Sequence, residues 1–186
     1  MKVLRQVFLR YLIVIILSFL FDFIFNEITE GVICNFVENI LFAIVLTCPH
    51  LIISNKRLSK LFFIISYIIF SISACFETIY YNIFETTFGS SVIFVILDTN
   101  YEESKEFISF YLNPEISFFL IIILTTVIIT LLSLKSKYFI IEKPAKAFQV
   151  KVFCLFFGLI IFIKLSLLII YNTPYMAIRA SIQYYI

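Results

Sequence analysis

The sequence predicts an all-α polytopic membrane protein with five transmembrane helices and short amphipathic helices in one long outer connection. Hydrophobic residues make up 62% of the 186 residues, and charged residues only 14%. A soluble chain of this size carries charge on roughly a quarter of its residues. The hydrophobic residues also gather in runs of about 20, which is the length a helix needs to cross the hydrocarbon core of a bilayer.

The hydrophobic runs give the expected spans in chain order, at about 7–25, 31–53, 61–84, 116–134 and 152–171. Each run is about twice as long as a strand of a membrane barrel, and none alternates in polarity. Only a helix satisfies its own backbone hydrogen bonds within one segment in lipid. Helix-breaking prolines lie near the predicted ends, at positions 49, 114, 144 and 174. We therefore expect one transmembrane domain over residues 1–171.

The charges predict how this domain is oriented. Eleven of the 14 basic residues lie before or at the start of the first span and in the second and fourth connections: Lys2, Arg5, Arg10, Lys56, Arg57, Lys60, Lys135, Lys137, Lys143, Lys146 and Lys151. The other side holds only Lys105 and Arg179, together with most of the acidic residues. Because cytoplasmic connections carry an excess of Lys and Arg, we expect a cytoplasmic N-terminus and a periplasmic C-terminus.

The outer connection over residues 85–114 is far longer than the others, and long connections tend to be functional. We expect two short helices there, lying on the membrane surface. Thr99 with Glu102 fits a capping box, and Asn100 with Glu103 fits the same spacing one residue later. A capping box needs no further function, so a purely structural interpretation stays open.

Beyond this cap, the spacing predicts an interfacial amphipathic helix. One face would hold Tyr101, Ser104, Ile108 and Leu112, and another would hold Glu102, Glu106 and Ser109. Such a helix would present acidic side chains at the depth of the lipid headgroups. There they would meet an ethanolamine ammonium or a bound cation, unless they form only a solvated surface.

Three charged residues, Glu38, Glu77 and Lys164, lie inside predicted spans, all in the outer half. A charge at the centre of a span costs on the order of 2.5–3.5 kcal/mol on insertion scales, so such residues are candidates for function. One interpretation is a salt bridge from Lys164 to Glu77 or Glu38. A second is a polar outer cavity, in which Lys164 faces a lipid phosphate and a carboxylate faces the amine. A third is snorkelling of these side chains to the interface.

The sequence offers no catalytic machinery of its own. No nucleophile stands with a base and an orienting group, and no nucleotide loop or cluster of metal ligands is visible. The cysteines show no CxxC spacing, and the single histidine, His50, has no companion ligands. We therefore expect no catalytic residue, no metal site and no nucleic-acid partner in this chain.

Three stretches of the sequence resemble the membrane half of the phosphoethanolamine transferases. They are FETIYY at 76–81, FGSS at 88–91 and ILDTNYEESKEF at 96–107. These sulfatase-like enzymes modify lipid A or the lipooligosaccharide core, and they carry an ETN-x-x-E type motif between the third and fourth of five helices. In this chain the motif begins with Asp98 in place of glutamate. The predicted topology, with its cytoplasmic N-terminus, is similar too, and so is the Asn172-x-Pro174-Tyr175 sequence that follows the fifth span.

The resemblance implies a periplasmic transfer in two steps. A threonine nucleophile on a zinc-bound catalytic domain takes phosphoethanolamine from phosphatidylethanolamine and passes it to a sugar phosphate or hydroxyl. The membrane half helps to bind the donor lipid, and Thr99 and Glu103 occupy the positions of a donor-site threonine and glutamate. An asparagine of that site in some members corresponds to Val95 here.

The same resemblance places the nucleophile and the zinc ligands beyond Ile186, after a juxtamembrane segment at 172–186. They would belong to a continuation of the chain or to a separately encoded catalytic domain. The alternative function is a small non-enzymatic lipid-binding or assembly subunit of the inner membrane. A transporter fragment is disfavoured, because the spans lack half-helices interrupted by Gly or Pro and no repeat is visible.

Overall fold

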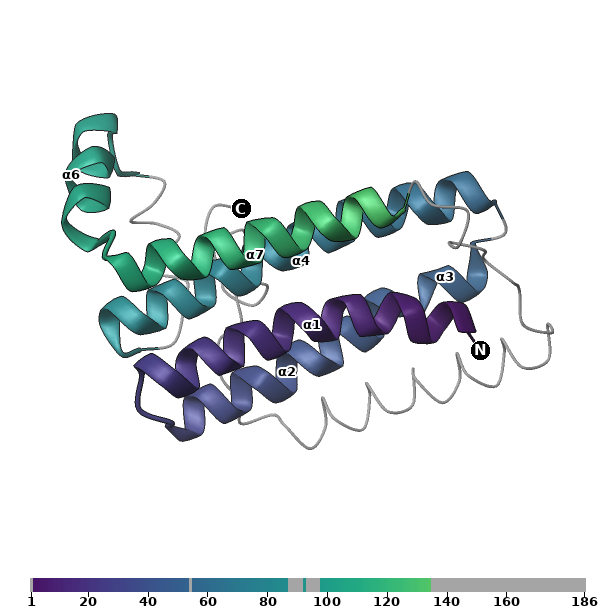
Figure 1. The fold of residues 1–186 in the computed structure, drawn as a ribbon, viewed down its shortest axis with the longest axis horizontal. Coiled ribbons are helices and arrows are strands. Elements are labelled where there is room, and N and C mark those ends of the chain that lie inside the picture. Colours follow the sequence, from purple (N-terminus) through teal and green to yellow (C-terminus); the bar gives the residue numbers. More distant parts are fainter. Residues whose placement is uncertain (1, 54, 87–91, 93–97, 135–186) are drawn as a thin grey trace, which may run out of the picture.

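The computed structural model describes residues 2–53, 55–86, 92 and 98–134, and within these residues the secondary structure is entirely helical (Figure 1). Four of the helices are long and apolar enough to cross a membrane: α1 (Lys2–Phe25), α2 (Glu30–Thr47), α4 (Lys56–Phe84) and α7 (Pro114–Ser133). Two shorter helices lie between them, α3 (Pro49–Ile52) and α6 (Tyr101–Tyr111). The all-α prediction is thus confirmed for the described part of the chain.

Several predicted features lie outside the described residues. They are the fifth span at 152–171 with Lys164, the juxtamembrane segment at 172–186, Val95, and most of the stretch in which a second short outer helix is expected.

The four long helices form an up-and-down bundle around α1. In Figure 1, α1 lies beside α2 and α4 lies beside α7, and α1 also packs against α4 and α7. The short helix α3 lies at the end of the bundle where the chain begins, and α6 lies at the opposite end.

Three helix boundaries differ from the predicted spans: α1 begins at Lys2 rather than near residue 7, and the ends of two other helices are set by particular side chains. The second helix ends at Thr47 rather than near residue 53, because Pro49 has no backbone N–H to donate and instead takes the first position of α3. The third long helix begins at Lys56 rather than near residue 61. The side chain of Asn55 caps it, accepting a hydrogen bond of 2.9 Å from the backbone N–H of Arg57. The basic segment is therefore the first turn of α4.

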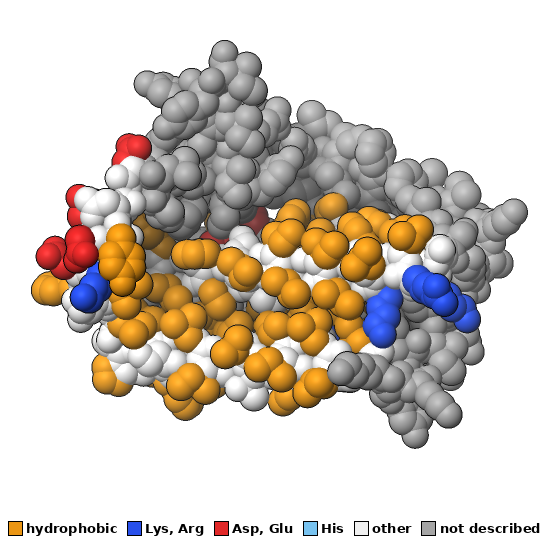
Figure 2. Space-filling view, turned by 90° about the horizontal axis from the view of Figure 1, so that it is seen from above, with side chains coloured by type: hydrophobic (Ala, Val, Ile, Leu, Met, Phe, Trp, Pro, Cys, Tyr) orange, Lys and Arg blue, Asp and Glu red, His pale blue; other side chains and the backbone are white. Residues whose placement is uncertain are grey.

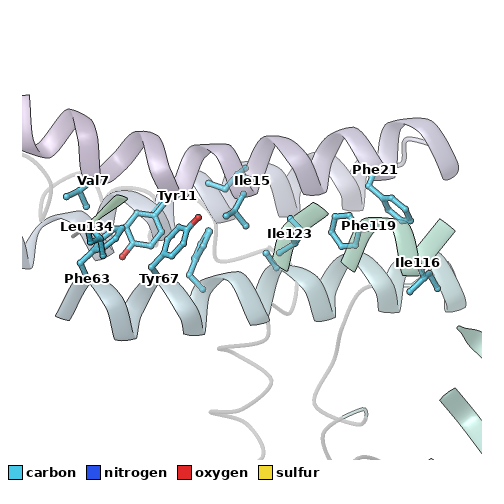
Figure 3. Close-up of a cluster of buried hydrophobic side chains, with 14 residues drawn as sticks. Val7, Tyr11, Ile15, Phe21, Phe63, Tyr67, Ile116, Phe119, Ile123 and Leu134 are labelled. Atoms are coloured by element: carbon cyan, nitrogen blue, oxygen red, sulfur yellow. The ribbon is translucent and has the colours of Figure 1, made fainter. Parts of the chain in front are cut away.

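The core runs along the seam between α1, α4 and α7 (Figure 3). Tyr11 of α1 lies edge-on to Phe63 and Tyr67 of α4, with ring centroids 5.7 and 5.6 Å away. Its hydroxyl group is hydrogen-bonded to Ser66 at 2.7 Å. Nearer the other end, Phe21 of α1 packs on Phe119 of α7 at 4.6 Å. In lipid, such packing and interhelical hydrogen bonds are what hold helices together.

The two ends of the bundle carry opposite charge: in Figure 2 most of the Lys and Arg atoms (blue) lie at one end of the long axis and Asp and Glu atoms (red) lie at the other. The basic end, where α1 and α4 begin, holds Arg5, Arg10, Lys56, Arg57 and Lys60. The acidic end, where α1 and α4 finish and α6 lies, holds Glu27, Glu30, Glu85, Asp98, Glu102, Glu103, Glu106 and Glu115. Among the described basic residues only Lys105 lies at the acidic end. This is the charge asymmetry from which the orientation is predicted.

Lys60 ties the start of α4 to the end of α7. Its Nζ donates a hydrogen bond of 2.9 Å to the backbone carbonyl oxygen of Leu134. A cation at a helix C-terminus contributes about 0.3–1 kcal/mol. We expect Lys60→Met to lower the free energy of unfolding in detergent by about this amount. The exposed Lys56 provides a control of equal charge, and equal losses in Lys56→Met and Lys60→Met would contradict the capping role.

His50 of α3 gives the basic end a predicted pH dependence. Its Nδ1 lies 2.8 Å from the hydroxyl oxygen of the buried Ser59, and burial lowers the pKa of His50 to about 4. In the unfolded chain the pKa is about 6.5, so the unfolded state binds the proton first as the pH falls. The stability that the neutral ring contributes is complete above about pH 6.5 and is lost toward pH 4.

We therefore expect the thermal midpoint in detergent to fall more steeply in wild type than in His50→Gln between pH 7 and pH 4. Glutamine can keep a hydrogen bond to Ser59 and does not titrate. Parallel curves for the two proteins would contradict a contribution from His50.

Candidate functional site

The first candidate site is the start of α6, where the motif residues lie. Asn100 is the N-cap: its Oδ1 accepts a hydrogen bond of 2.9 Å from the backbone N–H of Glu103. In return, the carboxylate of Glu103 accepts from the backbone N–H of Asn100 at 3.3 Å and from its Nδ2 at 2.9 Å. The capping box is therefore Asn100 with Glu103, and the pairing of Thr99 with Glu102 is wrong. The carboxamide of Asn100 thus accepts from the helix through Oδ1 and donates to Glu103 through Nδ2.

The helix α6 is fixed to the end of α4 by aromatic rings. Phe84 of α4 lies 6.3 Å from Phe107 and 5.7 Å from Tyr111 between ring centroids, and these two α6 rings lie 4.5 Å apart. The face predicted to lie in the membrane interface is exposed, at Tyr101, Ile108 and Leu112, and takes no part in the ring contacts with α4. Phe107 and Tyr111 are four residues apart and therefore lie on one face of α6, and this face packs on α4. The motif residues at the start of α6 are therefore held at the acidic end of the bundle.

The second candidate site, a polar network between α1, α2 and α4, consists of separate hydrogen-bonded sets of side chains. Glu77 of α4 is only 6% exposed, and its Oε2 accepts a hydrogen bond of 2.9 Å from Nδ2 of Asn39 on α2. The same Nδ2 donates to Oδ1 of Asn35 at 3.2 Å. Glu38 of α2 is half-buried and directly precedes Asn39 in the chain. Two of the three predicted intramembrane residues, Glu38 and Glu77, are thus related through Asn39, while Lys164 lies outside the described part.

Asp22 of α1 is a member of this network that the sequence interpretation assigned only to the outer side. It is 5% exposed, and its Oδ1 accepts a hydrogen bond of 3.0 Å from Nδ2 of Asn26. Oδ1 of Asn26 in turn accepts from Nδ2 of Asn82 on α4 at 2.9 Å. The spacing along α1 could have revealed this: Asp22 and Tyr11 are eleven residues apart, so they lie on one face of the helix.

A hydrogen bond between Thr29 and Tyr81 closes the network at its outer edge. The two hydroxyl oxygens are 2.7 Å apart, and Tyr81 also reaches the backbone carbonyl oxygen of Glu27 at 3.5 Å. The turn between α1 and α2 is thereby joined to the last turn of α4, directly before the connection that leads to α6. The network and α6 are therefore parts of the same end of the molecule.

The chemistry that the network offers is hydrogen-bond acceptance with negative charge. The Glu77 carboxylate accepts from an amide group on a neighbouring helix, and the Asp22 carboxylate accepts from an amide group one turn further along its own segment. Figure 2 shows acidic atoms recessed below the hydrophobic surface as well as on α6. In the described ranges no group of three or more His, Cys, Asp or Glu side chains is arranged to hold a metal ion. The zinc ligands that the resemblance implies are thus not found among these residues.

The comparisons with known proteins add no relative. No protein-family model, no curated protein and no solved structure matches the chain. What the chain does is therefore inferred from the motif residues and from the geometry of the acidic end.

Proposed function

We propose that this chain is the membrane domain of a phosphoethanolamine transferase in a bacterial inner membrane. In this proposal α1, α2, α4, α7 and the segment 152–171 cross the bilayer, with the basic end in the cytoplasm and the acidic end in the periplasm. The domain binds the phosphatidylethanolamine donor and anchors a sulfatase-like catalytic domain that modifies lipid A or lipopolysaccharide core. That catalytic domain, with its zinc, is supplied beyond residue 186 or by a separate chain.

The observation that supports this proposal best is the fixed position of the motif. Thr99 and Glu103 flank the capped start of α6, which aromatic contacts hold against the end of α4. A carboxylate beside an ammonium makes a strong charge-assisted hydrogen bond, so Glu103 is suited to the ethanolamine end of the donor. The exposed aromatic side chains of α6, above all Phe110 at 81%, suit a helix that lies at the membrane surface.

The orientation is supported by the separation of charge along the bundle. Basic residues dominate the end where the chain begins, and this is the end that the positive-inside rule assigns to the cytoplasm. The acidic end would then face the periplasm together with the long connection. In the same proposal Glu38, Glu77 and Lys164 are the polar residues of an outer cavity, with Lys164 available to a lipid phosphate.

The test replaces Glu103 by alanine in the chain assembled with its catalytic domain. A hydrogen bond to a charged group contributes about 1.5–3 kcal/mol, so we expect transfer from phosphatidylethanolamine to fall about 10- to 100-fold. Glu102→Ala is the matched control, because Glu102 is an exposed carboxylate in the same turn. Asn100→Ala removes the cap and keeps the carboxylate, so it should cost much less transfer than Glu103→Ala.

The alternative, a non-enzymatic lipid-binding or assembly subunit, is favoured by a different observation. Both oxygen atoms of Glu103 already accept hydrogen bonds from Asn100, so its carboxylate has a structural task. This alternative predicts equal effects of Asn100→Ala and Glu103→Ala. It also predicts that the DNA past codon 186 and the neighbouring genes encode no sulfatase-like domain, whereas the proposal requires one.

A further inference from the structure

The basic end of the bundle contains a buried polar atom that makes no hydrogen bond. His50 of α3 is only 7% exposed, and its Nε2 has no hydrogen-bond partner in the described part of the chain. Buried polar atoms are nearly always hydrogen-bonded, so an exception points to a partner such as a ligand. This atom belongs neither to the α6 motif nor to the polar network at the acidic end.

The hydrogen bond on the other side of the ring indicates which kind of partner Nε2 lacks. Nδ1 of His50 lies 2.8 Å from Oγ of Ser59. If the Ser59 hydroxyl group donates to Nδ1, the proton of the neutral ring is on Nε2, and only this N–H is unsatisfied. If Nδ1 donates instead, both Nε2 and the hydroxyl proton are unsatisfied, because no other described residue is hydrogen-bonded to Oγ of Ser59. The first arrangement is therefore favoured, and Nε2 needs an acceptor.

The charges around His50 favour an acceptor that is negative. Between Glu38 and Glu77, a stretch that includes α3 and the start of α4, no described residue is Asp or Glu. The guanidinium group of Arg10 lies 5.6 Å from the ring centroid of Phe63, and the ring of His50 lies 6.1 Å from the same centroid. The surroundings of Nε2 are therefore electropositive.

The start of α4 adds positive charge beside His50. Lys56, Ser59 and Phe63 follow one another at intervals of three and four residues, so they lie on the face of α4 that contacts His50. Lys56 is exposed and lies one turn before Ser59. A helix N-terminus also carries partial positive charge and favours phosphate groups. The unsatisfied N–H, an ammonium group and a helix N-terminus thus occur together.

The depth of this place suits a lipid phosphate. The 29 residues of α4 span about 43 Å, which exceeds the roughly 30 Å of a hydrocarbon core, so the ends of the helix project. Ser59 is three residues after Lys56, so it lies about 5 Å from the start of α4. Figure 1 shows α3 at the same end of the bundle. His50 is therefore near the boundary between hydrocarbon and headgroups.

We propose that His50, Lys56 and the N-terminus of α4 form a binding site for the phosphate group of an anionic phospholipid. The Nε2–H of His50 and the ammonium of Lys56 donate hydrogen bonds to the phosphate oxygens, and such bonds to a charged acceptor are strong. The phosphate reaches the buried Nε2 by displacing α3, which is a single turn of four residues and too short to be stable by itself. The site lies at the opposite end from the α6 motif and goes beyond the proposed function, because it holds whether or not the chain serves a transferase.

The experiment measures lipid retention by native mass spectrometry of the full chain from nanodiscs that contain equal amounts of phosphatidylglycerol and phosphatidylcholine. We expect wild type to retain phosphatidylglycerol at least about tenfold better, because the choline group brings a positive charge to an electropositive site. His50→Phe keeps a ring but neither nitrogen, and it should lose most of that preference. His50→Gln should keep most of it, because its carboxamide oxygen can accept from Ser59 while its nitrogen donates to the phosphate.

Lys56→Gln and Arg57→Gln form a pair of variants that each remove one positive charge. Arg57 is exposed in the same turn, but it is two residues from Ser59 and therefore lies on another face of α4. The general attraction to anionic lipid falls by about the same amount in both variants. We expect Lys56→Gln to lower the preference at least about threefold more than Arg57→Gln. Because both side chains are exposed, this comparison holds if His50→Phe fails to fold.

A second arm separates the two sources of the phosphate. Inorganic phosphate, with chloride at equal ionic strength as control, is added to the chain in detergent, and the thermal midpoint is measured. A rise that His50→Phe loses identifies a site for free phosphate, while retention of the lipid alone identifies a headgroup site.

Equal retention of both lipids with no effect of phosphate would overturn the proposal. Equal effects of Lys56→Gln and Arg57→Gln would also overturn it, since they would mean that only the general charge of this end attracts the lipid. Because Glu103→Ala tests transfer separately and at the other end of the bundle, failure of this site leaves the proposed function standing.

Discussion

Replacing Phe63 by alanine is expected to lower the free energy of unfolding in detergent by about 3–5 kcal/mol. Phe63 is fully buried and stacks on Tyr67 with 5.3 Å between ring centroids. The guanidinium group of Arg10 lies over the Phe63 ring, 5.6 Å from the ring centroid. Between helices in lipid or detergent the attraction comes mainly from van der Waals contacts. The loss therefore arises from the cavity and from the ring contacts that alanine cannot make.

The matched control for this prediction is Phe76→Ala, on the same helix. Phe76 is exposed, so its replacement leaves no cavity and should cost no more than about 0.5 kcal/mol. Unfolding by a denaturing detergent, followed by circular dichroism, measures both losses. Similar losses for the two phenylalanines would mean that the seam between α1 and α4 is not the core of the protein.

The second large effect is expected from Asn39→Leu, at about 3 kcal/mol of lost stability. The substitution removes the donor that lies 2.9 Å from Glu77 and leaves a buried carboxylate with fewer partners. A buried charged group that loses its partner pays the desolvation cost without compensation. The free energy of unfolding of the single variant, measured as above, checks the size of the loss.

The double variant Asn39→Leu/Glu77→Leu tests the cause of that loss. Replacing both members of a buried polar pair by apolar residues is often neutral, so we expect most of the stability to return. If the double variant is instead as unstable as the sum of the two single variants, the amide and the carboxylate act independently.

The long helices were the part of the fold that the sequence predicted well. The run at 116–134 corresponds to α7, which begins at Pro114 because the side chain of Asn113 accepts a hydrogen bond of 2.7 Å from the backbone N–H of Ile116. The first run was predicted at 7–25 and α1 ends at Phe25. Long apolar runs predict helices because lipid leaves the backbone no other local way to satisfy its hydrogen bonds.

Helix ends in polar segments were less predictable, since they depend on which of several side chains makes the cap. Thr99 and Asn100 both have the right spacing to a glutamate, and the choice of Asn100 follows from its paired hydrogen bonds with Glu103. In the same way Asn55 extends α4 through a basic turn that hydropathy alone excludes from a span. Each choice is decided by only a few hydrogen bonds, which a pattern of residue types does not reveal.

The network of Asp22, Glu38 and Glu77 was predictable only in part. The two glutamates stand out as charges within apolar runs, but the register of α1 against α4 decides that Asp22 is linked to Asn82 of α4 through Asn26. Register depends on how side chains of different helices interlock, here Tyr11 among the rings of α4, and a single sequence does not state it. The spacing of Tyr11, Ser18 and Asp22, which places them on one face of α1, was the signal that the sequence offered.

The central claim is that this chain presents a membrane lipid donor to a catalytic domain, and one measurement tests it most directly. The sulfatase-like domain encoded past codon 186 or in a neighbouring gene is reconstituted in phosphatidylethanolamine vesicles with and without this chain, and the initial rate of phosphoethanolamine transfer to a lipid A acceptor is compared. We expect at least a tenfold higher rate with the chain present, and loss of most of that gain in Glu103→Ala. Equal rates with and without the chain would contradict it.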